Sequence, residues 1–196
     1  AASITPADWK SRNGSYAGPV EGFFPHTLGR DFSGVVRELG DSAEGLQIGD
    51  EVYGVTLQGA DGAYAEAIAI GADLVGLKPA SINHDQAAAL ALTTLTAMIA
   101  LEDTAQLVEG QKLLVQGGAG GVGSVGIQIG HYLGAHVIST ASPGNHNYVS
   151  GLGADEVIDT DPDGWRDRLK ALTGGKGPDV VFDPVCGPLF EAAFRS

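Results

Sequence analysis

The sequence predicts an α/β fold in two parts, a small antiparallel β unit followed by a doubly wound parallel sheet. Short segments rich in β-branched and aromatic residues, separated by glycine-rich turns, fill residues 1–80. From Lys112 onward, strand-like and helix-like segments alternate, which is typical of a parallel sheet with helical crossovers. The glycine motif Gly118-x-Gly120-x-x-Gly123 directly follows the first of these strands. We place the boundary between the two parts after residue 80.

The first part contains one helical turn and several short strands. Residues 1–6 end a strand, and residues 7–14 read as a short helical turn closed by a glycine. Further strands are predicted at residues 32–39, 49–54 and 62–70, where apolar and polar side chains partly alternate. This pattern indicates an antiparallel, β-barrel-like unit.

The second part begins with an apolar helix. Ser81 or Asn83 can cap a helix that starts near Asp85. Residues 87–101 are apolar on every face, so we expect this helix to be buried between two layers. The apolar run is also shorter than the roughly 20 residues that a membrane-spanning helix needs. We therefore expect no association with a membrane.

Strands and helices then alternate to the end of the chain. Strands are predicted at residues 112–116, 136–139, 156–158 and 179–183, and helices at residues 122–133, 145–151 and 164–172.

The amino-acid composition argues against several classes of function. With 11 basic and 24 acidic residues the net charge is −13, which argues against a nucleic-acid or anionic-membrane surface. The single cysteine, Cys186, excludes an intramolecular disulfide and any multi-cysteine zinc site. A small, buried and inert thiol is expected there, with a reactive thiol as the alternative. No signal peptide is visible, which favours a cytoplasmic protein, and both ends read as interrupted elements of a longer chain.

Each glycine of the motif has a physical role in binding a dinucleotide. Gly118 would permit a backbone conformation that a side chain obstructs, and Gly120 would let a pyrophosphate approach the main chain. Gly123 would let the following helix pack close to the strand. Phosphates would then lie on the unpaired amides at the helix N-terminus. The alternative is a purely structural turn, since a chain with 30 glycines can contain the motif by chance.

Several short motifs, in this order, resemble the medium-chain dehydrogenase/reductase superfamily, in its zinc-independent quinone oxidoreductase and enoyl reductase branch. They are Ala2-Ser-Ile-Thr-Pro-Ala-Asp-Trp-Lys10, Leu28-Gly-Arg-Asp-Phe-Ser-Gly34, Gly49-Asp-Glu-Val-Tyr-Gly54, Gly62-Ala-Tyr-Ala-Glu66, Leu95-Thr-Ala97, Gly118-Ala-Gly-Gly-Val-Gly123, Leu152-Gly-Ala-Asp155 and Val181-Phe-Asp-Pro-Val185.

This resemblance implies a GroES-like catalytic domain at residues 1–80 and a Rossmann dinucleotide-binding domain at residues 81–196, both partial. Zinc members of the superfamily have a cysteine near the start and a later Gly-His-Glu, where this chain has Thr5 and Ala7, and Gly29-Arg-Asp31. The five histidines show no ligand spacing either. No metal is therefore expected.

The resemblance also implies which residues form the site. Tyr16 matches a tyrosine often found at the substrate mouth of quinone oxidoreductases, and Tyr53 and Tyr64 are the other phenols available in the chain. Tyr16 and Tyr64 are the candidate catalytic residues, because a phenol can donate a hydrogen bond to a substrate carbonyl. The ordinary alternative for each is a half-buried aromatic with a hydrated hydroxyl. The residues implied to contact the cofactor are Pro6, Trp9, Lys10 and Thr96 at its nicotinamide half, Gly118, Gly120, Gly121, Val122 and Gly123 at the glycine turn, and Thr140, Ser142, Asn145 and Val185 at the ends of neighbouring strands.

Three of these polar residues have structural alternatives. Thr96 can instead bond back within its own helix. Asp8 and Asp31 lie in turn-like motifs, where carboxylates commonly brace the backbone, and we expect that role for both.

The loop after the second strand of the parallel sheet bears on the choice of cofactor. A site that prefers NAD usually has an acid about 20 residues after the glycine turn, where it binds the ribose 2′-hydroxyl. Residues 139–147 contain no acid, which favours NADPH over NADH. NADPH-dependent members commonly have a lysine or arginine in this loop, which this chain lacks.

These observations lead to two functional hypotheses. The first is a zinc-independent, NADPH-dependent reductase of a quinone or an α,β-unsaturated carbonyl or enoyl compound. The second is an NADP(H)-binding regulatory or redox-sensing module with little or no turnover. The expected partners are a small-molecule substrate and, for the full-length protein, a second copy in a homodimer.

Overall fold

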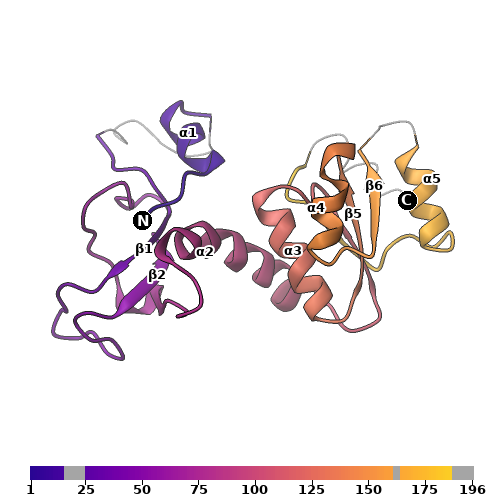
Figure 1. The fold of residues 1–196 in the computed structure, drawn as a ribbon. Coiled ribbons are helices and arrows are strands. Elements are labelled where there is room, and N and C mark those ends of the chain that lie inside the picture. Colours follow the sequence, from indigo (N-terminus) through magenta and orange to yellow (C-terminus); the bar gives the residue numbers. More distant parts are fainter. Residues whose placement is uncertain (16–24, 161–163, 187–196) are drawn as a thin grey trace. The chain divides into compact units, whose positions relative to one another are not determined.

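The computed structural model describes residues 1–15, 25–160 and 164–186, and its contacts divide the chain into two compact units, Ala1–Leu92 and Thr93–Ser196 (Figure 1). Tyr16 lies outside the described residues. The domain boundary predicted after residue 80 stays a prediction.

The first unit is built on a small antiparallel sheet, as predicted. Its strands are β1 (Asp31–Val35), β2 (Glu51–Val55) and β3 (Val75–Leu77), in the order β1-β2-β3. Helix α1 (Pro6–Arg12) precedes the sheet, and a single 3₁₀ turn, η1 (Ala72–Leu74), leads into β3. Ala2 forms an isolated bridge with Phe32, which agrees with an extended segment at the start of the chain.

The prediction of a strand at residues 62–70 is wrong. The backbone amides of residues 62–64 donate to carbonyls of residues 27–29 at 2.7–2.9 Å, so this segment folds onto a loop instead of a ladder. A Cβ atom at Gly62 would lie 2.5 Å from the carbonyl oxygen of Leu28, so a side chain would block this approach. The third strand is β3, and the strand predicted at residues 32–39 already ends at Val35.

The predicted apolar helix forms, but only part of it is buried. Helix α2 (His84–Met98) continues as a π-helix, η2 (Ile99–Thr104). Ala97 and Leu101 are buried, whereas Leu95 and Ile99 are each 46% exposed. The expectation of a helix enclosed between two layers is therefore wrong within the described chain. A helix that is apolar all round gives no periodic signal of which face is covered.

The helix is longer than the apolar run at residues 87–101, and the expectation of no membrane association stays a prediction. Residues 84–104 form 21 continuous helical residues, which by length and composition alone are enough to cross a membrane. One such helix is weak evidence, because the core helix of a globular protein has the same properties.

The second unit contains the predicted parallel sheet. Its strands are β4 (Lys112–Val115), β5 (His136–Ala141), β6 (Glu156–Asp159) and β7 (Val180–Phe182), in the order β6-β5-β4-β7. The helices are α3 (Gly121–Tyr132), α4 (His146–Gly151) and α5 (Trp165–Leu172), with a short 3₁₀ turn, η3 (Pro143–Asn145), after β5. Each helix lies within one residue of its predicted bounds.

Alternate residues of the strands fill two cores, one on each face of this sheet. Leu113, Val115 and Val137 pack in one cluster with residues of α3 and α4. Leu114, Ile138 and Ile158 pack in the other with Trp165 and Leu169 of α5. Figure 1 accordingly shows the sheet between α5 and the pair formed by α3 and α4.

Candidate functional site

The glycine turn connects β4 to α3, where the motif predicts it. The neighbouring strand β5 holds the turn through Thr140. The amide of Gly117 donates to Thr140 Oγ1 at 2.9 Å, and the amide of Gly118 donates to the Thr140 carbonyl at 2.9 Å. Thr140 is only 2% exposed. Its hydroxyl therefore supports the turn, and a direct contact between Thr140 and a cofactor stays a prediction.

The glycines are needed for reasons that partly differ from those expected. The left-handed backbone occurs at Gly117, with φ +65°, and not at Gly118. Gly118 is required for space, because a Cβ atom there would contact Ser139 Oγ and lie 2.7 Å from Ile127 Cδ1. A Cβ atom at Gly123 would lie 2.9 Å from the carbonyl carbon of Gly117, so Gly123 allows a close approach of α3 to the turn, where the sequence predicted a close approach to the strand.

The start of α3 suits an anion. Gly120 is the N-cap residue of this 12-residue helix, and its own amide donates to the Gly117 carbonyl at 2.9 Å. The next three amides, those of Gly121, Val122 and Gly123, have no acceptor in the part of the chain that the structure describes. Unpaired amides and the positive end of the helix dipole both favour phosphate oxygens. The residues present therefore fit the pyrophosphate of a dinucleotide.

The loop after β5 carries hydroxyl and amide groups and no carboxylate. Ser142 and Asn145 are exposed, and Asn145 Nδ2 donates to Ser142 Oγ at 3.1 Å. His146 Nε2 lies 3.1 Å from the carbonyl oxygen of Ala141. The first acid beyond the loop, Asp155, accepts from the amide of Val137 at 2.7 Å, at the opposite end of β5.

The turn after β7 lies against the glycine turn. The side chain of Val185 is 56% exposed, and its Cγ2 occupies the space that a side chain at Gly117 would need. Cys186 is exposed, so the expectation of a buried thiol is wrong. The strand ends at Phe182, and Cys186 lies on the turn beyond it with φ +62°, outside the packed layer.

Thr96 lies on the exposed side of α2. It lines a cavity of about 530 Å³ that residues 96–105, at the end of α2 and along η2, form with β7. The other lining side chains are mostly apolar, among them Ile99, Val181 and Phe182.

In the first unit, α1 carries the other predicted cofactor contacts. Pro6 is the first helical residue, and Asp8 holds the helix start by accepting from the Thr5 amide at 2.7 Å and the Thr5 hydroxyl at 2.9 Å. The ammonium of Lys10 lies 5.7 Å from the ring centre of the exposed Trp9. A cation above an aromatic face is a weak but favourable contact.

Asp8 and Asp31 brace the backbone, as predicted. Asp8 also accepts from the amide of Gly29 at 3.1 Å. Asp31 accepts from the Ser3 hydroxyl and, at 3.0 Å, from the amide of Leu92 within α2. Burial raises the pKa of Asp31 above its ordinary value, and the nearby Asp8 carboxylate adds to this effect.

Tyr64 lies beside these carboxylates. Its hydroxyl donates to the Ser3 carbonyl at 3.2 Å, and its ring covers Gly29. Burial, followed by the hydrogen bond and charge of Asp8, raises the pKa of Tyr64 to about 12. The phenol therefore stays protonated at neutral pH and acts as a hydrogen-bond donor. The prediction for Tyr16 lies outside the described residues.

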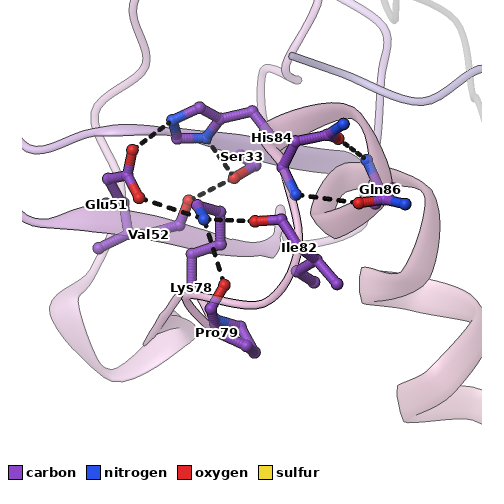
Figure 2. Close-up of polar contacts among 9 residues, drawn as sticks. Ser33, Glu51, Val52, Lys78, Pro79, Ile82, His84 and Gln86 are labelled. Carbon is purple, nitrogen blue, oxygen red and sulfur yellow. Dashed lines mark hydrogen bonds and ion pairs between the residues drawn. The ribbon is translucent and has the colours of Figure 1, made fainter.

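A polar network at the start of α2 was not predicted from the sequence (Figure 2). His84 Nδ1 lies 2.8 Å from Ser33 Oγ, and its Nε2 lies 3.4 Å from Glu51 Oε1. Lys78 Nζ lies 3.1 Å from Glu51 Oε2 and lowers the pKa of this carboxyl. Ser33 is buried and donates to the Val52 carbonyl at 2.8 Å, so this serine–histidine–glutamate arrangement is a structural clasp and not a nucleophile.

No group of three or more histidine, cysteine or acidic side chains suited to a metal ion occurs among the residues that the structure describes.

Two protein families match separate segments of the chain. Residues 1–80 match the family described as "Alcohol dehydrogenase GroES-like domain", and residues 121–196 match the family described as "Zinc-binding dehydrogenase".

Individual relatives are similar over nearly the whole chain. The mouse protein "NAD(P)H oxidoreductase RTN4IP1, mitochondrial" is 36% identical over 203 residues, which cover 95% of this chain and 50% of that protein. The tomato (Solanum lycopersicum) "2-methylene-furan-3-one reductase" is 39% identical over 193 residues, with coverages of 94% and 48%. The chain thus spans about half the length of the curated relatives it matches.

A solved structure agrees in fold. The Escherichia coli quinone oxidoreductase complexed with NADPH has a TM-score of 0.86 and 32% sequence identity, and the match covers 97% of this chain and 57% of that one.

Proposed function

Because the chain belongs to the medium-chain dehydrogenase/reductase superfamily, we propose that the protein is a zinc-independent oxidoreductase that transfers hydride from NADPH to a quinone or an α,β-unsaturated carbonyl compound. The observation that carries this proposal is the glycine turn, where three amides without an acceptor among the described residues begin α3.

The loop after β5 supports NADPH over NADH. A carboxylate at this place would bind the ribose 2′-hydroxyl and repel a 2′-phosphate, and residues 139–147 contain none. The exposed Ser142 hydroxyl and Asn145 amide offer neutral donors to the phosphate. The E. coli relative is complexed with NADPH, which agrees with this choice.

The substrate class is supported by relatives. The tomato relative is named for the reduction of a 2-methylene-furan-3-one, a compound with a carbon–carbon double bond conjugated to a carbonyl. The E. coli relative is a quinone oxidoreductase. Both classes accept hydride at an electron-poor carbon, and both develop negative charge on an oxygen.

In this proposal, the chain's own residues position the cofactor and the substrate and stabilise the charge that develops in the reaction. When bound, the dinucleotide supplies the hydride. The amides of Gly121, Val122 and Gly123 would hold its pyrophosphate. In the proposed reaction, the Tyr64 hydroxyl exchanges its hydrogen bond to the Ser3 carbonyl for one to the substrate oxygen as negative charge develops there, and its raised pKa keeps the proton on the phenol. Tyr16 is the second candidate for this donor.

The test is NADPH oxidation by the complete protein with quinones, enones and enoyl thioesters. We expect turnover with at least one class, and a strong loss in Gly120→Val, which places a side chain in the path of the pyrophosphate. Gly151→Val is the matched control, because a Cβ atom at Gly151 meets no atom within 4 Å. No NADPH oxidation with any of the three classes would refute the proposal.

A second candidate function is an NADP(H)-binding module with little turnover. The loop at residues 139–147 favours it, because it lacks the lysine or arginine that would bind a 2′-phosphate strongly. Calorimetry that finds NADPH binding in a protein without turnover would support this function, and ordinary steady-state kinetics would exclude it.

A further inference from the structure

The turn that follows β7 is held by one carboxylate. Asp183 Oδ1 accepts from the amide of Val185 at 2.8 Å and from the amide of Cys186 at 2.9 Å. A carboxylate that bonds to amides two and three residues ahead closes the chain into a tight turn. Asp183 thus determines where the backbone goes after the sheet ends.

This turn is conformationally costly. Cys186 has φ +62°, in the left-handed region that non-glycine residues avoid. The second oxygen, Asp183 Oδ2, is buried and has no hydrogen-bond partner among the residues that the structure describes. A buried oxygen without a donor is unfavourable. The two bonds to Oδ1 must therefore compensate for both the backbone conformation and the buried oxygen.

The turn places a side chain on the glycine loop. Val185 carries the first of the two bonded amides, and its Cγ2 lies over Gly117. The amide of Gly117 in turn donates to Thr140. The carboxyl ends of β4 and β7 are adjacent in the sheet, where Val115 pairs with Phe182. Ligands of open parallel sheets bind at this edge.

We infer that Asp183 is a positioning residue for dinucleotide binding, which acts by holding Val185 as a wall beside the glycine turn. The inference rests on the proposed function, because this wall matters only if a dinucleotide binds there. Asp183 itself need not contact the cofactor, because it acts through the two hydrogen bonds that its Oδ1 accepts from the amides of Val185 and Cys186.

The test compares NADPH binding by calorimetry in four variants of the complete protein. Asp183→Ala loses both bonds, and we expect its Kd to rise about tenfold, which corresponds to about 1.4 kcal/mol. Asp183→Asn keeps an oxygen at Oδ1, and we expect its Kd to stay within about twofold of wild type. Asp183→Ser retains a weaker acceptor and should be intermediate, which keeps the test valid if Asp183→Ala does not fold.

The fourth variant is a rescue. Adding Cys186→Gly to Asp183→Ala removes the penalty on the left-handed backbone, so we expect it to recover part of the lost affinity. A residue that merely stabilises the fold would not be rescued at this position. Equal affinities of Asp183→Ala and wild type would overturn the inference, as would an Asp183→Asn variant as weak as Asp183→Ala.

Amide hydrogen exchange separates this inference from the proposed function. In cofactor-free protein we expect the Val185 amide to be protected in wild type and Asp183→Asn, and unprotected in Asp183→Ala. Wild-type protein that does not bind NADPH refutes the proposed function. Wild-type protein that binds it, with a Val185 amide equally protected in all variants, refutes the inference alone.

Discussion

Single buried carboxylates organise the first unit. Asp31 is 1% exposed and ties the Ser3 hydroxyl and the Leu92 amide to β1. Because burial penalises its charged form, Asp31 favours the protonated state more in the folded chain than in the unfolded chain. Its two hydrogen bonds partly offset this penalty. The residue is therefore both a brace and a source of pH-dependent stability.

We expect Asp31→Asn to gain stability relative to wild type as pH rises. The folded-state pKa of Asp31 lies above the ordinary value of 3.8, so its contribution is fully present below that pH and is lost as pH rises through the folded-state pKa. Asparagine does not titrate, and its oxygen can still accept from Leu92.

The measurement is urea unfolding at about pH 3.5 and about pH 7, where the two states of Asp31 differ most. Asp41→Asn, at an exposed position, is the control. A difference between Asp31→Asn and wild type that is the same at both pH values would contradict the prediction.

Tyr64 gives a second prediction for a single residue. With its pKa at about 12, the phenol does not ionise between about pH 7 and pH 10, so the hydrogen bond to substrate that we propose for it would persist across this range. We expect Tyr64→Phe to lower kcat by about tenfold to a hundredfold, with no new pH dependence below about pH 10. Steady-state kinetics from about pH 7 to pH 10 test this prediction, and Tyr53→Phe is the control. An unchanged kcat in Tyr64→Phe would show that Tyr64 takes no part in the reaction.

At the scale of elements, α2 is anchored at its first turn. Asn83 Oδ1 accepts from the Gln86 amide at 2.9 Å, and Gln86 Oε1 accepts from the Asn83 amide at 3.0 Å. The clasp of Ser33, His84 and Glu51, to which Lys78 is paired through Glu51, lies directly beside this cap (Figure 2). Lys78 also donates to the carbonyl of Pro79 at 3.2 Å, so the loop before the helix is held as well.

We expect Asn83→Ala to reduce the free energy of unfolding by about 1 kcal/mol, because the Gln86 amide loses its acceptor. Ser81→Ala is the matched control, since Ser81 is the other cap that the sequence allows and makes no hydrogen bond at this helix start within the described part of the chain. Denaturant titration measures both variants. Equal losses at the two positions would show that the cap contributes nothing specific.

At the scale of the whole molecule, the predicted binding groups lie on two compact units. The glycine turn, the loop after β5 and the turn after β7 belong to the second, and Pro6, Trp9, Lys10 and Tyr64 belong to the first. The chain carries a net charge of −13. An anionic cofactor must therefore be held by local amides and hydroxyls against an unfavourable overall charge.

We expect NADPH to raise the melting temperature, because a ligand that binds only the folded state stabilises it by about 2.7 kcal/mol at a hundred times its Kd. NADH at equal concentration should have a smaller effect. New hydrogen-exchange protection should appear at residues 117–123 and 142–145. Equal shifts with NADH and NADPH would exclude the NADPH preference, and the Gly120→Val variant provides the binding control.

Much of the second unit could be predicted from the sequence because its signals are local. The alternation of strands and helices and the glycine motif each depend on neighbouring residues, and the structure confirms them. The first unit was predicted less well. Residues 62–70 have a strand-like pattern, but the competing carbonyls of residues 27–29 are distant in sequence.

Thus the sequence by itself determined the fold class, the parallel sheet and the position of the glycine turn, since these follow from periodicity and backbone sterics. Only the tertiary structure decided which face of α2 is covered, that Cys186 is exposed, and that Asp183 closes the turn against Gly117. It also decided that Gly117 adopts the left-handed backbone, whereas Gly118 is needed because Ser139 and Ile127 occupy the space that a side chain would take. These properties depend on contacts between residues far apart in the chain, which no local pattern records.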